Sequence, residues 1–351
     1  MAGSQAHFLA RRFGVKMMND MTHKPRVTII VLGGTITMVP QASGGISPSI
    51  SGDELVAAVP QLESVANLTV VTPFLVPGAS LTFAQMDTVT ELIRDAGNTG
   101  DDGVVVVQGT DTIDETAFLI DLAGVAAAGN LAVVVTGAMR GAAAPGADGH
   151  ANLLAAVTVA AAPQARGKGT LVVLNDEVHA ACFVQKMDTG LPSAFVSPGV
   201  GPVGSVTEGQ FRLRMLPHVP ANSALRLINA APVGMVATGL GDDGRLIDQM
   251  LDAGYEGAVI AAMGAGHVPV QIVSKLEKLS GLMPVVLSTR VPGGVVFTQS
   301  YGFPGSEIDL LRRGLIPSGI LPPHKARLLL ACLLGNTKSR DDIELQFRAF
   351  A

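Results

Sequence analysis

Residues 103–112 read GVVVVQGTDT, four consecutive valines that run straight into small and polar residues. Valine favours strands, and an apolar run without polar alternation is typical of a strand covered by helices on both faces. Comparable runs are Arg26–Leu32, Leu68–Pro73, Leu131–Thr136 and Thr170–Asn175. Helical patterns lie between them, one opened by a capping box of Ser51 and Glu54 and one by Thr82. The alternation predicts an α/β fold with a mostly parallel sheet.

The second half of the chain indicates a second domain, as a length of 351 residues also suggests. Gly and Pro interrupt the pattern over 198–220, and it resumes with expected strands at Met235–Thr238, Ala258–Met263 and Pro284–Ser288. We therefore expect four segments: an N-terminal extension over 1–25, a larger α/β domain over 26–210, a linker over 211–232 and a smaller α/β domain over 233–351.

The composition excludes several classes of protein. With 48% apolar and 15% charged residues, the chain resembles a well-packed soluble protein more than a disordered one. A net charge of −5 without a Lys/Arg cluster argues against nucleic-acid binding. No apolar run reaches the roughly 20 residues of a membrane helix, and no signal peptide is evident, so we expect a cytoplasmic protein. Cys182 and Cys332 are expected to be buried thiols, and the sparse charge favours a homo-oligomer.

Small or polar residues follow three of the expected strands, where open α/β sheets bind ligands. These segments are Gly33-Gly34-Thr35, Gln108-Gly109-Thr110-Asp111-Thr112, and Asn175-Asp176-Glu177 with Lys186 downstream. The Gly-Gly-Thr turn could be structural or could bring the backbone close to a ligand. Thr110 and Asp111 could cap a helix, or that helix could aim N–H groups at an oxyanion. Lys186 could be a surface lysine or a base toward a threonine hydroxyl.

Other chemistry finds little support in the sequence. The histidines are scattered without metal-ligand spacing, which argues against a metal site. No G-x-G-x-x-G follows the first strand, and no G-x-S-x-G occurs, so neither a dinucleotide cofactor nor an α/β-hydrolase nucleophile is indicated. We expect no metal and no cofactor.

Six ordered motifs make nearly the whole chain resemble the bacterial-type L-asparaginase family. The motifs are Gly33-Gly34-Thr35-Ile36, residues 108–117, Thr136-Gly137-Ala138-Met139-Arg140, Ala147-Asp148-Gly149 with Leu174-Asn175-Asp176 and Lys186, Ser288-Thr289-Arg290-Val291, and Pro323-His324-Lys325-Ala326-Arg327. The resemblance implies a catalytic N-terminal domain, a smaller C-terminal domain, no cofactor and a homotetramer with sites between subunits.

Residue by residue, the resemblance implies that Thr35 is the nucleophile and that Thr110, Asp111 and Lys186 form a second polar group. Asp111 would also bind the substrate α-ammonium. Substrate contacts are implied at Gly78, Ala79, Ser80, Gly109, Asp111, Ala138 and His267. The implied reaction is hydrolysis of L-asparagine to aspartate and ammonia. The alternatives are a glutaminase-asparaginase of broad specificity, an amidase that supplies ammonia, and a non-catalytic amino-acid-binding protein.

The sequence departs from the family pattern at three places. No tyrosine occurs in 38–50, where many members carry one that orients the nucleophile; Gly45 falls near that position. Tyr301 occupies the position of that tyrosine's glutamate partner, so we expect it to supply the phenol. The serine that grips the substrate carboxylate aligns with Gly78, or with Ser80 after a shift of two. His267 replaces an asparagine, and it is either a site residue or a hydrogen-bonded loop histidine.

Overall fold

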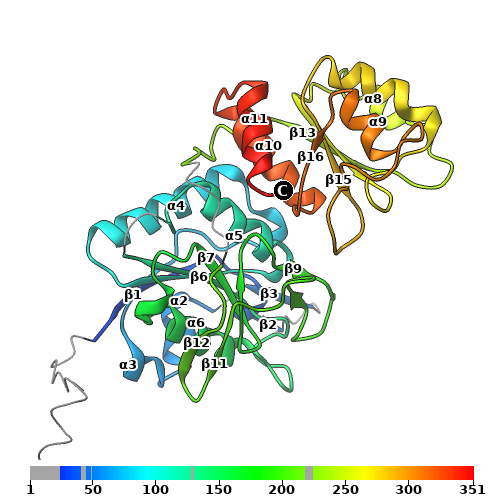
Figure 1. The fold of residues 1–351 in the computed structure, drawn as a ribbon. Coiled ribbons are helices and arrows are strands. Elements are labelled where there is room, and N and C mark those ends of the chain that lie inside the picture. The colour runs from blue at the N-terminus through cyan, green and yellow to red at the C-terminus, as the bar shows by residue number, and fades with distance from the viewer. Residues whose placement is uncertain (1–23, 41–44, 49, 128–129, 218–223) are drawn as a thin grey trace, which may run out of the picture.

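The protein folds into two α/β domains joined through a shared core (Figure 1). The structure is a computed structural model that describes residues 24–40, 45–48, 50–127, 130–217 and 224–351. Most of the expected N-terminal extension lies outside the described residues. Within the described part of the chain, no helix is long and apolar enough to cross a membrane.

The N-terminal domain is built on an eight-stranded sheet of order β12-β11-β8-β7-β6-β5-β1-β4. Five strands are parallel: β1 (Arg26–Val31), β4 (Asn67–Val71), β5 (Gly103–Val107), β6 (Ala132–Thr136) and β7 (Thr170–Leu174). The predicted parallel sheet is thus confirmed. Every residue of β5, β6 and β7 is buried, which agrees with their unbroken apolar runs.

Three further strands continue the sheet in antiparallel fashion, and the sequence patterns did not predict them. They are β8 (Glu177–Ala180), β11 (Gly204–Thr207) and β12 (Gln210–Leu213). Strand β12 extends past residue 210, where we expected the domain to end. Two short hairpins, β2 (Met38–Pro40) with β3 (Ile46–Pro48) and β9 (Gln185–Lys186) with β10 (Phe195–Val196), stand apart from this sheet.

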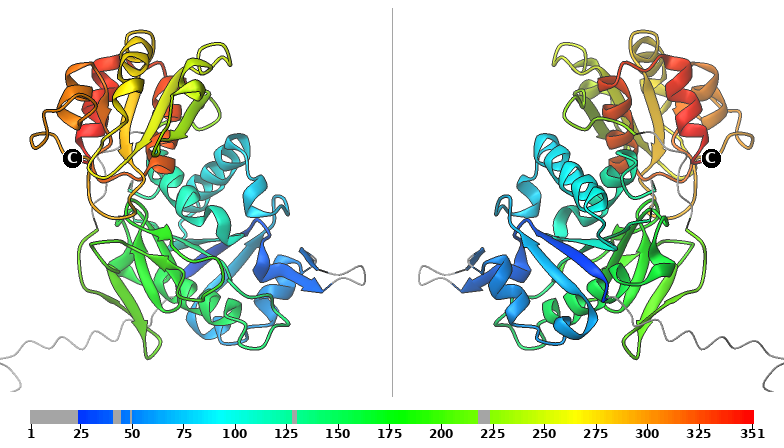
Figure 2. Two further views of the ribbon diagram at one scale, coloured as in Figure 1. Left: turned by 90° about the vertical axis from the view of Figure 1, so that its right-hand side faces the viewer. Right: turned by 90° about the vertical axis from the view of Figure 1, so that its left-hand side faces the viewer.

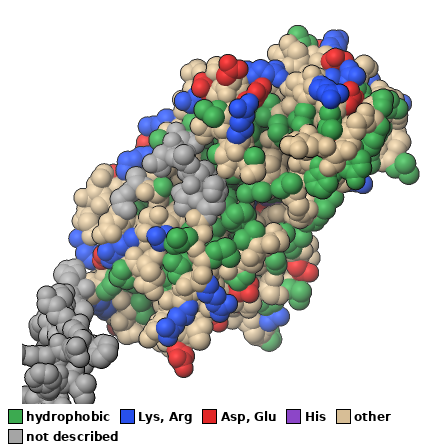
Figure 3. Space-filling model, viewed as in Figure 1, with side chains coloured by type: hydrophobic (Ala, Val, Ile, Leu, Met, Phe, Trp, Pro, Cys, Tyr) green, Lys and Arg blue, Asp and Glu red, His purple; other side chains and the backbone are tan. Residues whose placement is uncertain are grey.

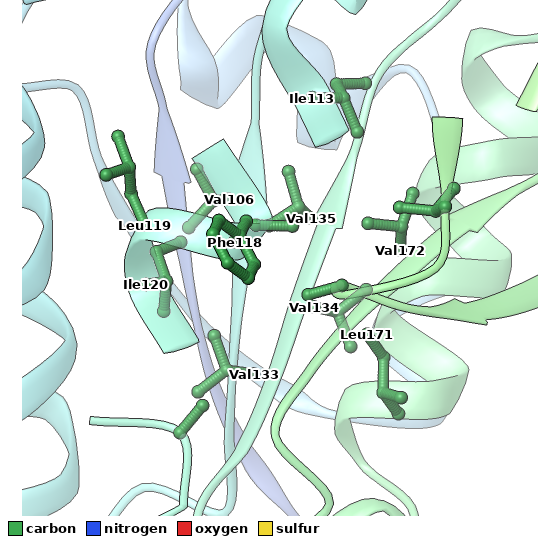
Figure 4. Packing of buried hydrophobic residues seen from close by; sticks show 14 of the residues in the cluster. Val106, Ile113, Phe118, Leu119, Ile120, Val133, Val134, Val135, Leu171 and Val172 are labelled. Carbon is green, nitrogen blue, oxygen red and sulfur yellow. The ribbon is translucent and has the colours of Figure 1, made fainter. Parts of the chain in front are cut away.

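Helices cover both faces of the N-terminal sheet. One face carries α4 (Phe83–Asn98) and α5 (Ile113–Leu122), and Figure 4 shows Phe118 of α5 beside valines of β5 and β6. The other face carries α6 (Gly149–Ala160), which contacts α3 (Leu62–Val65); α2 (Gly52–Ala57) packs near β1 and β4. Both expected caps are present, because Ser51 pairs with Glu54 and Thr82 pairs with Gln85 in capping boxes.

The C-terminal domain has a parallel sheet of order β13-β14-β15-β16, namely β13 (Val233–Ala237), β14 (Gly257–Ala262), β15 (Val285–Thr289) and β16 (Ile316–Pro317). Its helices are α7 (Arg245–Asp248), α8 (Val273–Ser280), α9 (Glu307–Arg312), α10 (Pro323–Gly335) and α11 (Arg340–Arg348). Figures 1 and 2 place α10 between α5 and this sheet. One apolar cluster therefore runs from the N-terminal sheet through α10 to β13–β16.

Candidate active site

Three short turns meet at the carboxyl ends of adjacent strands β4, β1 and β5. They are the 3-10 segments Gly78–Ser80, Thr35–Thr37 and Thr110–Thr112. A Cβ added to Gly34 would lie 2.1 Å from the backbone nitrogen of Gly109, and one on Gly78 would lie 2.7 Å from the Gly109 oxygen. The three glycines therefore allow direct backbone contact, which no larger residue permits.

Side-chain hydrogen bonds hold these turns together. The Thr112 Oγ1 donates to the Gly78 carbonyl oxygen at 3.0 Å. The Gln108 Nε2 donates to the Gly109 carbonyl oxygen and to the Thr112 Oγ1, both at 3.2 Å. Gln108 is fully buried, so its amide works in a low-dielectric environment where each hydrogen bond is strong. Side chains of the motif Gln108-Gly109-Thr110-Asp111-Thr112 thus stabilise the backbone of the motif itself and its contact with Gly78.

Thr35 and Thr110 directly follow the two glycines that touch, so the turns bring the two threonines into one region. Gly34 adopts φ 91° and ψ −179°, a conformation open only to glycine. Thr35 is half-buried and opens the short segment Thr35–Thr37, while Thr110 is buried. This conformation of Gly34 turns the chain after β1, so that Thr35 lies next to Gly109.

Lys186 links the two other polar residues predicted for the site. Its Nζ donates to the Thr110 Oγ1 at 3.0 Å and to the Asp111 Oδ1 at 2.8 Å. The Lys186 side chain is 18% exposed, whereas that of Asp111 is 68% exposed. A surface cavity of about 300 Å³ lies here, lined by Asp111, Lys186, Met187, Asp188 and Thr189. The ion pair therefore sits at the wall of a hollow large enough for an amino acid.

Asp114, from the motif at residues 108–117, also lies in this region. Its Oδ2 accepts the Lys186 backbone N–H at 3.4 Å and lies 3.3 Å from the His324 Nε2 of α10. Burial alone would raise the pKa of this carboxyl, but the His324 imidazole beside it and the nearby Lys325 charge hold it below its usual range. Asp114 is therefore an anion that ties Lys186 to the C-terminal domain.

The turn after β6 is shaped by Asp148. Its two carboxylate oxygens accept the backbone N–H groups of Met139 and Arg140, each at 2.9 Å. Ala138 in this turn is fully buried. Arg140 donates to the Gly146 carbonyl oxygen within the same loop. Asp148 and Arg140 thus make hydrogen bonds within this loop that fix its backbone.

Gly78 and Ser80 are the two alternatives expected at the position that holds the substrate carboxylate. Gly78 is buried against the Gly109 turn, while Ser80 and the neighbouring Ala79 are exposed. Gly78 can therefore offer only backbone atoms. The hydroxyl of Ser80 is the side-chain donor available in this segment. The register of this contact remains a prediction.

Tyr301 and His267 form a separate cluster in the C-terminal domain. Their rings meet edge to face at 4.8 Å, and Phe297 and Phe303 flank them. Buried Glu307 anchors the cluster, because its Oε1 accepts the Tyr301 N–H at 2.7 Å and its Oε2 lies 3.2 Å from the His267 Nε2. Among the residues that the structure describes, no hydrogen bond or ring contact joins Tyr301 or His267 to Thr35, Thr110, Asp111 or Lys186.

No group of three or more His, Cys, Asp or Glu side chains arranged to hold a metal ion occurs within the described ranges. The described cysteines, Cys182 and Cys332, are buried and unbridged, and burial raises the pKa of each thiol to about 12.

Comparison with known proteins covers both domains. The family "Asparaginase, N-terminal" matches residues 26–218, and "Glutaminase/Asparaginase C-terminal domain" matches residues 232–347. A probable L-asparaginase of Deinococcus radiodurans is 35% identical over 92% of this chain and 97% of its own length. L-asparaginase 2 of Escherichia coli is 33% identical over 93% of each.

A solved structure agrees with this assignment. The crystal structure of a probable cytoplasmic L-asparaginase from Campylobacter jejuni superposes with a TM-score of 0.81 at 29% identity, covering 93% of this chain and 99% of that one. The fold, the two family matches and the relatives all agree, so this chain belongs to the asparaginase family of amide-bond hydrolases.

Proposed function

We propose that this protein hydrolyses the side-chain amide of L-asparagine to L-aspartate and ammonia through a threonine nucleophile. The observation that carries the proposal is the position of the Lys186 Nζ, within hydrogen-bond distance of both the Thr110 Oγ1 and the Asp111 Oδ1. A site that only binds an amino acid does not need a lysine held against a threonine hydroxyl. An enzyme that transfers a proton during catalysis does need such a pair.

In the proposed first step, the Thr35 Oγ attacks the carboxamide carbon, and the proton of its hydroxyl is transferred to the amide nitrogen. The C–N bond then breaks, and the nitrogen leaves as ammonia after accepting a proton. In this proposal, backbone N–H groups near Gly109 and Thr110 bind the oxyanion. The product of this step is an ester between Thr35 and the aspartyl side chain.

In the second step, water attacks the ester carbonyl and Thr35 is released. The Thr110 hydroxyl, held by the Lys186 ammonium group, accepts the proton of the water and passes its own proton to the departing Thr35 oxygen. Asp111 holds Lys186 with one carboxylate oxygen, and its exposed side chain can receive the substrate α-ammonium with the other. Ser80 is the proposed partner of the substrate carboxylate.

The test is ammonia release from L-asparagine, D-asparagine and L-glutamine. We expect Thr35→Ala and Lys186→Met to lower kcat by about 100- to 10,000-fold, the usual contribution of such groups. Lys338→Met, at an exposed lysine after α10, is the matched control and should retain full activity. An unmodified protein that releases ammonia from none of the amides would instead be a binding protein. Full activity in both site variants would refute the residue roles.

Glutamine is the competing substrate. Relatives from Pseudomonas fluorescens and Pseudomonas aeruginosa that are 30% and 32% identical are named glutaminase-asparaginase. One methylene changes binding by only about 1–3 kcal/mol in a typical pocket, so some glutamine turnover is expected. The ratio of kcat/KM for the two amides measures the preference directly.

We also propose that the protein acts as a homotetramer in the cytoplasm. Tyr301, Phe297 and Phe303 are each more than 40% exposed in the single chain, an unusual position for three neighbouring aromatic rings. Figure 3 shows apolar side chains gathered on the face where the two domains meet. A second copy that covers the rings would bring Tyr301 toward the Thr35 of its partner. Sedimentation and Tyr301→Phe kinetics test this: a monomer, or full activity without the phenol, would refute it.

A further inference from the structure

Lys325 is a fully buried lysine in the first turn of α10, inside a motif to which the proposed reaction gives no role. Its Nζ donates to three backbone carbonyl oxygens: Ala181 at 2.7 Å, Val184 at 2.5 Å and Cys182 at 3.4 Å. An ammonium group has three N–H donors and no acceptor, so this arrangement uses all of its hydrogens. These carbonyls belong to the turn that joins β8 to β9, two residues before Lys186.

Stability alone is a poor reason to place a charge at this point. A buried ammonium has a large desolvation cost, and a well-packed apolar side chain of the same volume is often neutral or better for stability. The first turn of a helix also repels cations, because the helix dipole is positive there. Burial lowers the pKa of Lys325 to about 8, although Asp114 and other nearby acidic groups oppose the shift. The position therefore needs another explanation.

A second contact from the same helix turn points to the same target. His324, the preceding residue, lies 3.3 Å from the Asp114 Oδ2. That oxygen accepts the backbone N–H of Lys186. Two consecutive residues of α10 thus hold the chain around Lys186, one through the carbonyl groups before it and one through its own amide. Neither His324 nor Lys325 lines the hollow at Asp111.

We infer that Lys325 is a positioning residue for Lys186: its ammonium group fixes the 181–184 turn and thereby holds the Lys186 Nζ against Thr110 and Asp111. The inference rests on the proposed catalytic role of Lys186. By this inference, the C-terminal domain positions a residue in the site of its own chain. This role is separate from any contact that the domain makes with the site of a neighbouring copy. A lysine suits this position better than an arginine, because three converging carbonyl oxygens match a compact ammonium group and do not match a planar guanidinium group.

The experiment compares kcat and KM of Lys325→Met, which has no donor, and Lys325→Gln, whose amide offers two N–H donors. Thermal unfolding first establishes that each variant is folded. A displacement of about 1 Å at a catalytic group costs about 100-fold in rate, so we expect a kcat loss of that order for Lys325→Met. We expect KM to change by less than about twofold, because substrate contacts are untouched. Lys325→Gln should recover part of kcat, and the control Lys338→Met should match the unmodified protein.

Several outcomes would overturn the inference. Three of them are kinetic: an unchanged kcat in both folded variants, a rise in KM at constant kcat, or equal losses of kcat in the methionine and glutamine variants. The fourth is failure of both variants to fold, which would assign Lys325 to stability alone. Lys186→Met is measured in parallel. If Lys186→Met keeps activity, the proposed function itself fails; if it loses activity while the Lys325 variants do not, only the positioning role is refuted.

Discussion

Replacing Gly34 by alanine should force apart the two turns that carry Thr35 and Thr110. The added Cβ would lie 2.1 Å from the nitrogen and 2.3 Å from the Cα of Gly109. Both are backbone atoms, which cannot turn aside as a flexible side chain can. Ordinary contact begins at 3.4 Å, so the turns must separate by about 1.3 Å.

Two costs follow from this change. Holding alanine at φ 91° and ψ −179° costs about 1–3 kcal/mol, since that region suits only glycine. Overpacking costs a further 1–3 kcal/mol or so. We therefore expect the free energy of unfolding to fall by roughly 2–6 kcal/mol. The displacement of Thr35 from Thr110 should lower kcat by about 100-fold in the protein that remains folded.

The assay is urea unfolding followed by circular dichroism, together with ammonia release from L-asparagine. Gly209→Ala is the matched control, because Gly209 has φ 67° and no atom within 4 Å of an added Cβ. It carries the backbone strain alone and should lose only about 1–2 kcal/mol with activity intact. If Gly34→Ala loses no more stability than Gly209→Ala and keeps its kcat, the close approach of the two turns is not what the site needs.

Three further predictions concern carboxylates that accept backbone N–H groups. Asp148→Asn should lower the free energy of urea unfolding by about 1–3 kcal/mol, since one of two backbone N–H groups loses its acceptor; an unchanged midpoint would contradict this. Burial raises the pKa of Asp121 from 3.8 to about 6. The folded state therefore holds this proton more tightly than the unfolded chain, and the protein should lose stability relative to Asp121→Asn as pH rises from 3.8 to 6. Parallel stability curves across that window would show that the shift is absent. Glu307→Gln should lower kcat in step with Tyr301→Phe, because Glu307 fixes the Tyr301 backbone; normal kinetics would disconnect the two.

The sequence predicted the centre of the fold better than its edges. Strands β5, β6 and β7 begin or end within a residue of the expected ranges, because buried parallel strands are continuous apolar runs. Strands β8, β11 and β12 were missed. Their sequences EVHA, GSVT and QFRL are short and partly polar, and such patterns also suit loops.

The candidate site divides in the same way. Thr35, Thr110 and Asp111 could be found because they follow predicted strands directly, where ligands bind in such sheets. Asp114 and Lys325 could not be assigned their contacts, since their partners lie 72 and more than 140 positions away in the chain. Only the packing of α10 on α5 brings them together. The family resemblance marked both residues as part of motifs without saying what they touch.

The shared core also has a consequence for how this protein is made. Ribosomes deliver α10 and α11 after every element of the N-terminal domain, yet Leu329, Leu330 and Phe347 from these helices belong to the same apolar cluster as β5 and β6. The face of α5 that packs on α10 therefore stays uncovered until residues 323–335 have emerged from the ribosome. A domain that folds during synthesis buries its apolar surface early, whereas this N-terminal domain keeps the apolar face of α5 exposed until α10 has been made. Nascent chains that stall before residue 323 should consequently aggregate or depend on chaperones.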